Sequence, residues 1–317
     1  MENIFDLIKS SETIAIFAHI NCDGDAVGSA MAFKKYIDSL GKKCCVFIQR
    51  PISENYYFMG IDEVANKESL DSYDLAIAVD CPNTKRFGQF EVEFFKAKIS
   101  INIDHHLDND FFGTQNIVNT KISSACELIF NLFKEAKINI TPDVATCLYS
   151  GIATDTGRFS HSNTTYSSFI AAGELVKFGA DLETLNYNLF NHIKMNEFDI
   201  QRLALSNTEF YENGKIAFVG ITKKMLETAQ ADSTCTYRII DQINSIDGVE
   251  IAVLLTENKY KENLVSVRSR NYSAQRICKA FGGGGHLRAS GCRIFVPYKI
   301  AKNKLLEECK KELNRNE

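Results

Sequence analysis

Aspartate and histidine residues recur in four short segments of the first half of the chain, each of which follows an apolar run. The segments read HINCDGDAVGS, AVDCPN, NIDHHLDND and GIATDTGRF, and their acidic and imidazole residues include His19, Asp23, Asp25, Asp80, Asp104, His105, His106 and Asp155. Carboxylates with a smaller number of imidazoles suit Mn²⁺, with Mg²⁺ or Co²⁺ as alternatives. One ion needs fewer ligands than these, so the set suits two ions about 3.5–4 Å apart that share a carboxylate, an arrangement that serves phosphoester hydrolysis.

Each of these aspartates has a simpler explanation when it is taken alone. An Asp after a strand is usually a helix N-cap or a turn residue, and Asp25 is well placed to cap a following helix. Capping does not require histidines beside the acids, so the four segments together favour a metal site. Cys22 and Cys81 adjoin candidate ligands and would suit zinc. The neighbouring Asp23 and Asp80 are better ligands for this set, and we interpret the thiols as packing residues.

Alternating strand and helix patterns surround these segments. Apolar runs predict strands at 13–18, 44–49, 74–79 and 98–103, and helical spacing predicts helices at 25–40, 123–137 and 142–153. Strands that are apolar on both faces and separated by helices are typical of a mostly parallel sheet with helices on both faces. Because the carboxyl ends of parallel strands share one edge, we expect the four segments to meet there.

The second half of the chain has a different pattern. The stretch from about 186 to 208 reads as one helix. Beyond it, strands are predicted at 215–220, 249–255, 263–268 and 292–296, helices near 223–229, 234–245 and 273–280, and an amphipathic tail helix at 299–317 with Ile300, Leu305 and Leu306 as apolar contacts. We therefore expect an α/β fold with two domains, 1–185 and a smaller α+β domain at 209–317, joined by a helical linker at 186–208 and separated by a cleft.

A glycine run in the second half points to an anionic ligand. Gly282 to Gly285 lead into His286, and backbone N–H groups without side chains around them can cradle an anion. Taken alone, such a run is a flexible turn. Between positions 259 and 293, however, eight Lys and Arg residues, Lys259 among them, face a single acid, Glu262. Arginine matches phosphate oxygens in pairs, so this segment favours a ligand that carries phosphate.

The composition excludes several classes of protein. The 317 residues suit about two domains, and 45% hydrophobic with 24% charged residues is typical of a globular protein. No apolar run approaches the roughly 20 residues of a membrane span, and MENIFDLIKS does not read as a secretory signal. The ten cysteines are scattered, which indicates reduced thiols and a cytoplasmic protein. The net charge of −4 argues against a general polyanion-binding surface.

These motifs together resemble the DHH phosphoesterase superfamily with its DHH-associated C-terminal domain, and most closely its NrnA-like branch of nanoRNases and pAp phosphatases. The resemblance rests on HINCDGDAVGS, VDC, DHH, ATDTG and GGGGH in this order, and it covers essentially the whole chain. It implies an N-terminal domain that holds two Mn²⁺ ions and a C-terminal domain that binds the nucleotide across a cleft.

The resemblance also implies a role for individual residues. His19 and Asp23 would bind one ion, Asp25, His105 and Asp155 the other, and Asp80 would bridge both; Asp104 would orient a histidine, and His106 would face the scissile phosphate. The matching C-terminal pieces, VSVRSR and GGGGHLRASG, imply that Arg268, Ser269, Gly284, Gly285 and His286 bind the substrate. The family often has AASG where this chain has RASG, so Arg288 either modifies the pocket or points to solvent. Arg86 and Arg158, near two ligand segments, are further candidates for phosphate contact.

The implied activity is hydrolysis of short oligoribonucleotides of two to five residues to mononucleotides, and of 3′-phosphoadenosine 5′-phosphate (pAp) to AMP, by a water that two metal ions activate. A homodimer is compatible with this, and no membrane partner is expected. Hydrolysis of pApA, the linear dinucleotide of cyclic-di-AMP breakdown, is an alternative that would use the same site.

Other readings fit less well. Family II pyrophosphatases share the first motifs but carry a serine-arginine-lysine motif in place of the glycine run. RecJ-like exonucleases usually have additional domains. A nucleotide-binding module without catalysis would lack ligands, whereas every expected Asp and His is present.

Overall fold

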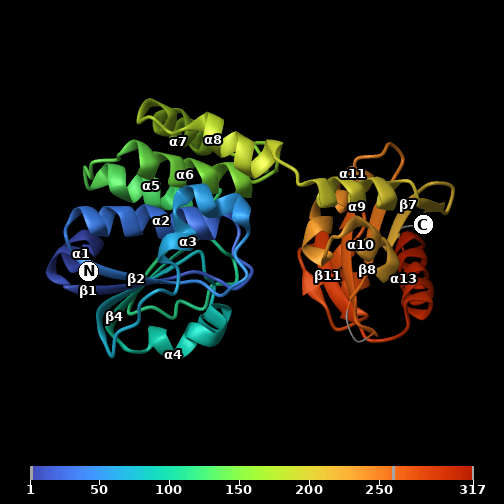
Figure 1. Ribbon diagram of the computed structural model, residues 1–317, viewed down its shortest axis with the longest axis horizontal. Coiled ribbons are helices and arrows are strands. Elements are labelled where there is room, and N and C mark those ends of the chain that lie inside the picture. The colour runs from blue at the N-terminus through green and yellow to red at the C-terminus, as the bar shows by residue number, and fades with distance from the viewer. Residues whose placement is uncertain (1–2, 259–260, 316–317) are drawn as a thin grey trace. The chain divides into compact units, whose positions relative to one another are not determined.

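The computed structural model describes residues 3–258 and 261–315, which form two compact units, Met1–His192 and Ile193–Glu317. Each unit contains its own sheet and its own hydrophobic cores. Figure 1 shows the first unit in blue to yellow-green and the second in yellow to red. The two-domain α/β architecture predicted from the sequence is confirmed, and the cleft between the domains stays a prediction.

Within residues 3–192, the first unit forms a five-stranded, fully parallel sheet with the strand order β2-β1-β3-β4-β5. The strands are β1 (Thr13–Phe17), β2 (Lys43–Phe47), β3 (Tyr73–Val79), β4 (Ala97–Asp104) and β5 (Gln115–Val118). The first four confirm the predicted strands. The short β5 was not predicted, because its four residues are only half-buried and give no apolar run.

Helices cover both faces of this sheet, as expected for strands that are apolar on both sides. One face carries α1 (Ile4–Ser10), α2 (Gly24–Ser39), α5 (Ala125–Glu135), α6 (Pro142–Asp155) and α7 (Tyr166–Lys177), and Figure 1 shows α2, α5, α6 and α7 stacked above the strands. The other face carries η2 (Thr84–Phe90) and α4 (Glu91–Phe94). Along β1, Ile14 and Ile16 pack toward the first face and Ala15 and Phe17 toward the second. Both faces of the strand are therefore core.

The helices over the sheet pack closely because of small residues at their crossings. At Gly28 of α2, an added Cβ would lie 2.4 Å from the backbone oxygen of Cys147 in α6. Glycine is therefore required at this crossing, and the first turn of α2, which carries Asp25, lies directly against α6.

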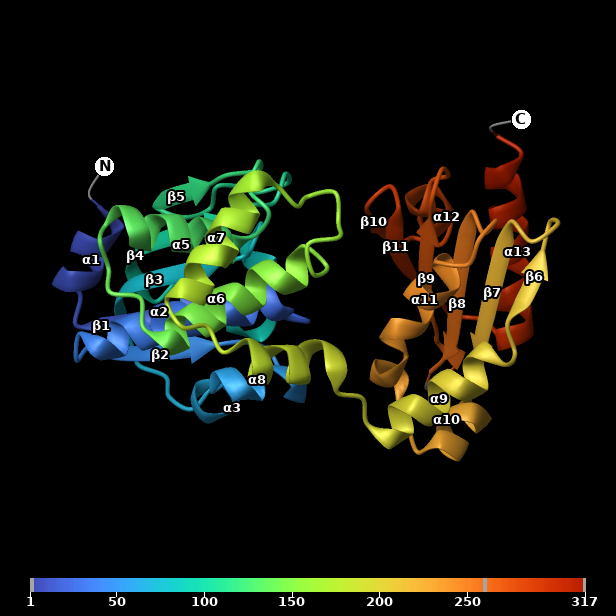
Figure 2. The same cartoon turned by 90° about the horizontal axis from the view of Figure 1, so that it is seen from above.

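Within residues 193–258 and 261–315, the second unit forms a six-stranded mixed sheet with the order β10-β11-β9-β8-β7-β6. The strands are β6 (Glu209–Tyr211), β7 (Ile216–Ile221), β8 (Ile251–Glu257), β9 (Asn263–Ser269), β10 (Gly284–Gly285) and β11 (Ala289–Ile294). Strands β7 and β8 are parallel, and the other neighbours are antiparallel. Figure 2 shows the strands of each sheet running side by side.

The helices of the second unit also cover both faces of its sheet. Helices α9 (Met195–Leu205), α10 (Lys223–Ala229) and α11 (Tyr237–Asn244) pack on one face, and α12 (Ala274–Lys279) and α13 (Tyr298–Leu313) on the other. The predicted α+β character is confirmed. In α13, Leu305 and Leu306 are buried as predicted, but Ile300 is 47% exposed, so its predicted apolar contact is wrong.

The stretch at 186–208 is helical but is not one helix. It contains the end of α8 (Leu182–Asn186), the π-helical turn η3 (Tyr187–Asn191), a non-helical break at residues 192–194, and α9. Helix α9 packs into the core of the second unit. The single-helix expectation is therefore wrong, since the break separates the two compact units.

Over the described parts of the chain, the helices are too short or too polar to cross a bilayer. Within the same residues, all ten cysteines are free thiols. Cys22 and Cys81 are buried, which agrees with their interpretation as packing residues. Lys259 of the predicted basic segment lies outside the described residues.

Candidate metal centre

The loop after β1 brings His19 and Asp23 beside the end of β3. The His19 Nε2 atom lies 3.2 Å from Asp80 Oδ2 and 3.7 Å from Asp23 Oδ1. Asp23 is the N-cap of α2, where its carboxylate accepts hydrogen bonds from the backbone N–H groups of Asp25 and Ala26. Asp25, for which capping was the alternative to metal binding, lies inside the first turn of α2 and is completely buried. The capping role therefore falls on Asp23, and Asp25 is left for another role.

Asp80 follows β3 and lies at the centre of the cluster. Its backbone adopts a left-handed conformation (φ 53°), which non-glycine residues rarely adopt and which recurs at functional sites. Its side chain is buried, and Oδ1 lies 3.4 Å from His105 Nε2 and 3.6 Å from His106 Nδ1. Among the described residues, Oδ1 has no hydrogen-bond partner. A buried carboxylate oxygen without such a partner is free to bind a cation.

Asp25 meets His105 and Asp155 on the α5 and α6 side of the cluster. His105 Nε2 lies 3.8 Å from Asp25 Oδ2 and 3.7 Å from Asp155 Oδ2. The Asp25 carboxylate also accepts hydrogen bonds from the backbone N–H groups of Ala125 and Cys126, the first residues of α5. These N–H groups form the positive end of a helix dipole, which stabilises a carboxylate.

Gly151 of α6 makes room for this carboxylate. A Cβ atom at this position would lie 2.7 Å from Asp25 Oδ1 and 2.2 Å from the Sγ atom of Cys126. Either contact is too close for a real Cβ, so a larger residue at Gly151 would displace Asp25.

His106 is held by a buried polar network. Its Nδ1 lies 2.7 Å from Asp104 Oδ1, and Asn109 Nδ2 donates hydrogen bonds to Asp104 Oδ2 (2.5 Å), to Asn102 Oδ1 and to the carbonyl oxygen of Cys81. Asp104 therefore contacts His106, not His105, so the histidine whose orientation it fixes is His106. The other ring nitrogen, Nε2, is left to meet a ligand.

These residues form three overlapping groups that could each hold a metal ion. The groups are His19, Asp23 and Asp80; Asp25, His105 and Asp155; and Asp80, His105 and His106, and within each group the ligand atoms lie within 4.8 Å of one another. The donor set has four carboxylates and three imidazoles; His19, Asp25 and Asp80 are buried, His105, His106 and Asp155 are half-buried, and Asp23 is exposed. The residues present therefore fit divalent cations of the Mn²⁺ and Mg²⁺ type.

The close packing of these groups shifts their proton affinities. Burial disfavours a charged His19, but hydrogen bonds to Asp23 and Asp80 outweigh it and raise the pKa of His19 to about 11. Burial likewise opposes the charge on His105, whose pKa is raised to about 10 by Asp80, Asp25 and Asp155. Burial raises the pKa of Asp155 to about 7 and that of Asp25 well above its usual value. Bound divalent cations would neutralise these carboxylates in place of protons.

The two candidate arginines of the first unit lie in different surroundings. The Nη2 atom of Arg86 lies 3.3 Å from His19 Nδ1. The buried Nε atom of Arg86 has no hydrogen-bond partner within the described residues. The guanidinium of Arg158 instead lies over the Phe190 ring, with Cζ 5.1 Å from the ring centroid. Arg86 therefore adjoins the cluster, and Arg158 contacts the π-helical turn η3.

The predicted substrate-binding residues of the second unit gather at one end of β9, β10 and β11. Arg268 pairs with Ala289 across β9 and β11, and the two residues of β10 pair with Gly291 and Ser290. Ser269 is buried, and its hydroxyl donates to the carbonyl oxygen of Tyr272, which also accepts from Arg288 Nη1. His286 is exposed beside them. Gly284 and Gly285 are exposed as well.

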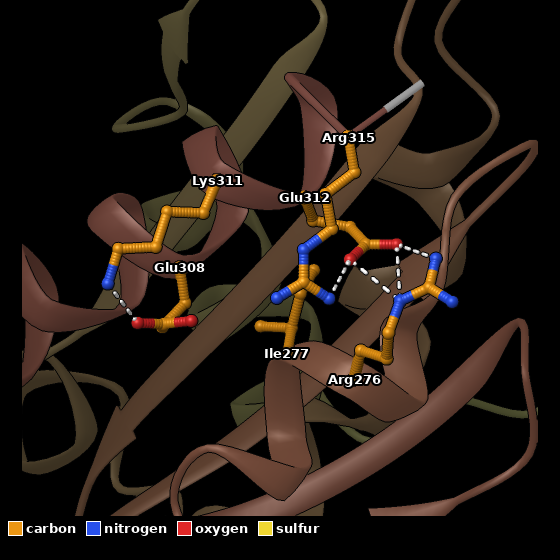
Figure 3. A pocket seen from close by; sticks show the side chains of 6 residues that line it. All are labelled: Arg276, Ile277, Glu308, Lys311, Glu312 and Arg315. Carbon is orange, nitrogen blue, oxygen red and sulfur yellow. Dashed lines mark hydrogen bonds and ion pairs between the residues drawn. The ribbon is translucent and has the colours of Figure 1, made fainter. Parts of the chain in front are cut away.

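The basic segment has more acidic partners than its sequence suggested. Arg276 binds Glu312 of α13 through both carboxylate oxygens, and Figure 3 shows Arg315 reaching the same carboxylate from the other side. Arg268 pairs with Asp241 at 3.3 Å, and Arg293 with Glu262 at 2.9 Å. Asp241 and Glu312, which lie outside the segment, thus neutralise part of its charge, so the positive charge available for a ligand is smaller than the sequence count.

Three polar residues near the cluster escaped the sequence analysis. Asn109 lies inside the NIDHHLDND segment, Asn163 follows GIATDTGRF by four residues, and Glu127 lies within the apolar helix α5. The sequence offered one signal, the acid Glu127 in an otherwise apolar helix. The structure shows that this acid is fully buried, and burial of an acid requires a compensating contact.

Comparison with known families places these observations in context. The DHH family, N-terminal domain, matches residues 13–152, and the DHHA1 domain matches residues 219–315. The two matches together cover about three quarters of the chain. The chain combines a DHH N-terminal domain with a DHHA1 domain. It is thus a metal-dependent phosphoesterase, and all of its candidate metal ligands except Asp155 lie within the residues that the DHH model matches.

Relatives of this DHH chain match along nearly its whole length. It is 29% identical to the probable bifunctional oligoribonuclease and PAP phosphatase NrnA of Streptococcus mutans, over 95% of each chain. It is also 29% identical to the bifunctional oligoribonuclease and PAP phosphatase NrnA of Thermus thermophilus, over 99% of this chain and 95% of that one. Among solved structures, an exopolyphosphatase-related protein from Bacteroides fragilis shares the fold, with a TM-score of 0.90, 23% identity and coverage of 97% and 94%.

Proposed function

We propose that this protein hydrolyses oligoribonucleotides of two to five residues to mononucleotides, and pAp to AMP, with two Mn²⁺ ions at the DHH site. The observation that carries the proposal is a pair of candidate ion-binding groups connected by a third, which shares Asp80 with the first and His105 with the second. Support for the substrates comes from relatives whose names include oligoribonuclease and PAP phosphatase.

The proposal assigns the ligands by group. His19 and Asp23 hold one ion, Asp25, His105 and Asp155 hold the other, and Asp80 contributes to both. Bound in this way, two divalent ions supply a water of lowered pKa and neutralise phosphate oxygens. The geometric support is that Asp80 approaches His19 with one carboxylate oxygen and His105 with the other.

Two further residues of the first unit act on the phosphate in this proposal. Because Asp104 occupies Nδ1 of His106, the Nε2 atom of that ring faces the substrate and donates a hydrogen bond to the scissile phosphate or a proton to the leaving oxygen. Arg86 has donors beside His19, and it neutralises charge on the phosphate.

The second unit holds the terminal phosphate of the substrate in this proposal. Arg268, Ser269, Gly284, Gly285, His286 and Arg288 form the binding site. The exposed backbone of Gly284 supports this role, since an added Cβ there would meet no other atom within 4 Å in the described part of the chain. A terminal phosphate held by this unit would favour short substrates over long RNA.

An activity panel tests this function. Protein stripped of metal with a chelator is given Mn²⁺, Mg²⁺, Co²⁺ or Zn²⁺ in turn, with pAp, pApA, RNAs of two to five residues and a kilobase RNA as substrates. We expect Mn²⁺ to restore the highest activity, on pAp and the short RNAs. Equal rates on kilobase RNA and dinucleotides would contradict the proposal. A marked preference for pApA over both pAp and the short RNAs would instead assign the chain to cyclic-di-AMP breakdown.

A further inference from the structure

Glu127 is a completely buried carboxylate that belongs to no candidate ion-binding group. It lies in the first turn of α5, and its Oε2 accepts three hydrogen bonds: from the backbone N–H of Ser123 (3.1 Å), from the Ser123 hydroxyl, and from the Ser168 hydroxyl of α7 (3.0 Å). Its Oε1 is buried without a partner within the described residues. A leucine would fill this space without the cost of desolvating an acid, so packing alone does not explain the residue.

The contacts of Glu127 fix the start of α5. Its carboxylate holds Ser123, and its own backbone N–H donates to the hydroxyl of Ser124, the N-cap of this helix. Between Ser124 and Glu127, the backbone N–H groups of Ala125 and Cys126 donate to the two carboxylate oxygens of Asp25 at 2.7 and 2.8 Å. The orientation of the Asp25 carboxylate therefore depends on the place where α5 begins.

A second chain of contacts runs from the same turn to Asp155. The carbonyl oxygen of Ser123 accepts a hydrogen bond from Asn163 Nδ2 (3.1 Å), and the same amide donates to the backbone oxygen of Asp155 (3.2 Å). The carboxylate of Asp25 and the backbone of Asp155 are thus both connected to the turn that Glu127 holds.

The other ion-binding group is positioned by different contacts. The His19 ring meets its neighbouring carbonyl oxygen of Ile20, and Asp23 accepts from the first turn of α2. The backbone N–H of Asp80 donates to Ile103 in β4. The Asp25 backbone N–H is one of the donors to Asp23, but the Asp25 side chain, which α5 orients, takes no part in these contacts. A change at Glu127 should therefore act mainly on the group that contains the Asp25 carboxylate.

We propose that Glu127 is a positioning residue for the ion held by Asp25, His105 and Asp155. The inference rests on the proposed two-ion function. Its hydrogen bonds keep the start of α5 and Asn163 in place, and these in turn hold the two carboxylates at the separation that an ion requires. Residues that orient metal ligands typically contribute about 10–100-fold in metal affinity.

Calorimetric titration of chelator-treated protein with Mn²⁺, and electron paramagnetic resonance of the free ion, test the proposal without any substrate. Glu127→Leu removes the three hydrogen bonds, and Glu127→Gln keeps an acceptor oxygen for them. Asp74→Leu is the matched control. Oδ2 of Asp74 also accepts three hydrogen bonds, from the backbone N–H groups of Glu12 and Thr13 and from the Thr13 hydroxyl, but at the opposite end of β3 from Asp80.

We expect Glu127→Leu to lower the affinity for one of the two Mn²⁺ ions by about 10–100-fold and to change the affinity for the other by no more than about twofold. Glu127→Gln should restore most of the lost affinity, and Asp74→Leu should bind both ions normally even if it unfolds at a lower temperature. Normal binding of both ions by Glu127→Leu, or an equal loss of both, would overturn the proposal.

Two further outcomes are distinguishable. If circular dichroism shows that Glu127→Leu does not fold, Asn163→Ala and Ser168→Ala, which each remove one link, take its place. A lower affinity for one of the two Mn²⁺ ions then supports the inference, and unchanged affinities for both refute it. Wild-type protein that binds a single Mn²⁺ ion would contradict the two-ion function itself, and the assignment of Glu127 to one of two groups would fall with it.

Discussion

The two units of the chain differ in how their charged residues are arranged. In the first unit, Asp25, Asp80 and Asp155 lie together at the carboxyl ends of the strands, largely buried, with carboxylates facing one another across histidines. In the second unit, acidic side chains pair with basic ones, as Glu312 does with Arg276 and Arg315. Crowded carboxylates oppose folding unless a cation neutralises them, whereas a paired charge is already satisfied.

This difference separates charges that bind a ligand from charges that stabilise the fold. The basic segment of the second unit stood out in the sequence, yet several of its arginines are occupied by Asp241, Glu262 and Glu312. In the acidic cluster of the first unit, the partners are histidines, and Oδ1 of Asp80 has no hydrogen bond within the described residues. Crowded, buried carboxylates are therefore the better guide to the candidate metal centre.

The largest expected effect follows from the removal of the central carboxylate. Asp80→Ala should lower phosphoester hydrolysis by more than about 100-fold, since even residues that only orient a metal ligand contribute 10–100-fold. Steady-state rates with Mn²⁺ and pAp measure this. Asp74→Ala, at the other end of the same strand, should retain activity. Undiminished hydrolysis by Asp80→Ala would mean that the crowded carboxylates are not the reactive centre.

A single added methyl group should have the next largest effect. Gly151→Ala places a Cβ against Asp25 Oδ1 and Cys126, so we expect activity to fall by about 10–100-fold. Gly173→Ala on α7 is the control, because an added Cβ there meets no described atom within 4 Å. That variant should keep full activity and gain about 0.5–1 kcal/mol in the free energy of unfolding. Equal rates for the two variants would show that Asp25 tolerates displacement.

The smallest effects are expected in the second unit and concern stability alone. Arg276→Ala leaves Glu312, whose side chain is 3% exposed, without its main partner, and should lower the free energy of unfolding measurably. Arg293→Ala breaks a pair whose arginine is 68% exposed and should cost less than about 1 kcal/mol. Urea denaturation measures both, and Mn²⁺ affinity should not change. A loss of Mn²⁺ affinity in either variant would contradict the division between the two units.

Most of the fold could be predicted because local pattern and tertiary role agree in the first unit. Strands such as β1 and β3 are apolar on both faces and end in polar residues, so both the strands and the edge where Asp80 lies followed from the sequence. The break at residues 192–194 was missed because NHIK contains neither glycine nor proline.

The supporting residues of the site could not be predicted from the sequence in the same way. Asn109 and Asn163 act through contacts with carbonyl and carboxylate oxygens, and such contacts exist only once the segments have folded together. The same holds for the pair of Arg268 with Asp241, since its acid lies outside the basic segment. Side-chain partners that are distant in sequence leave no periodic signal.

All residues of the three ion-binding groups fall between positions 19 and 155. Within the described residues, one continuous portion of the polypeptide therefore carries every candidate metal ligand. In the proposed function the later portion selects the substrate, so mutation or recombination there can change which molecule is cleaved while the metal centre is inherited intact. This arrangement favours the evolution of related enzymes that carry out the same reaction on different molecules.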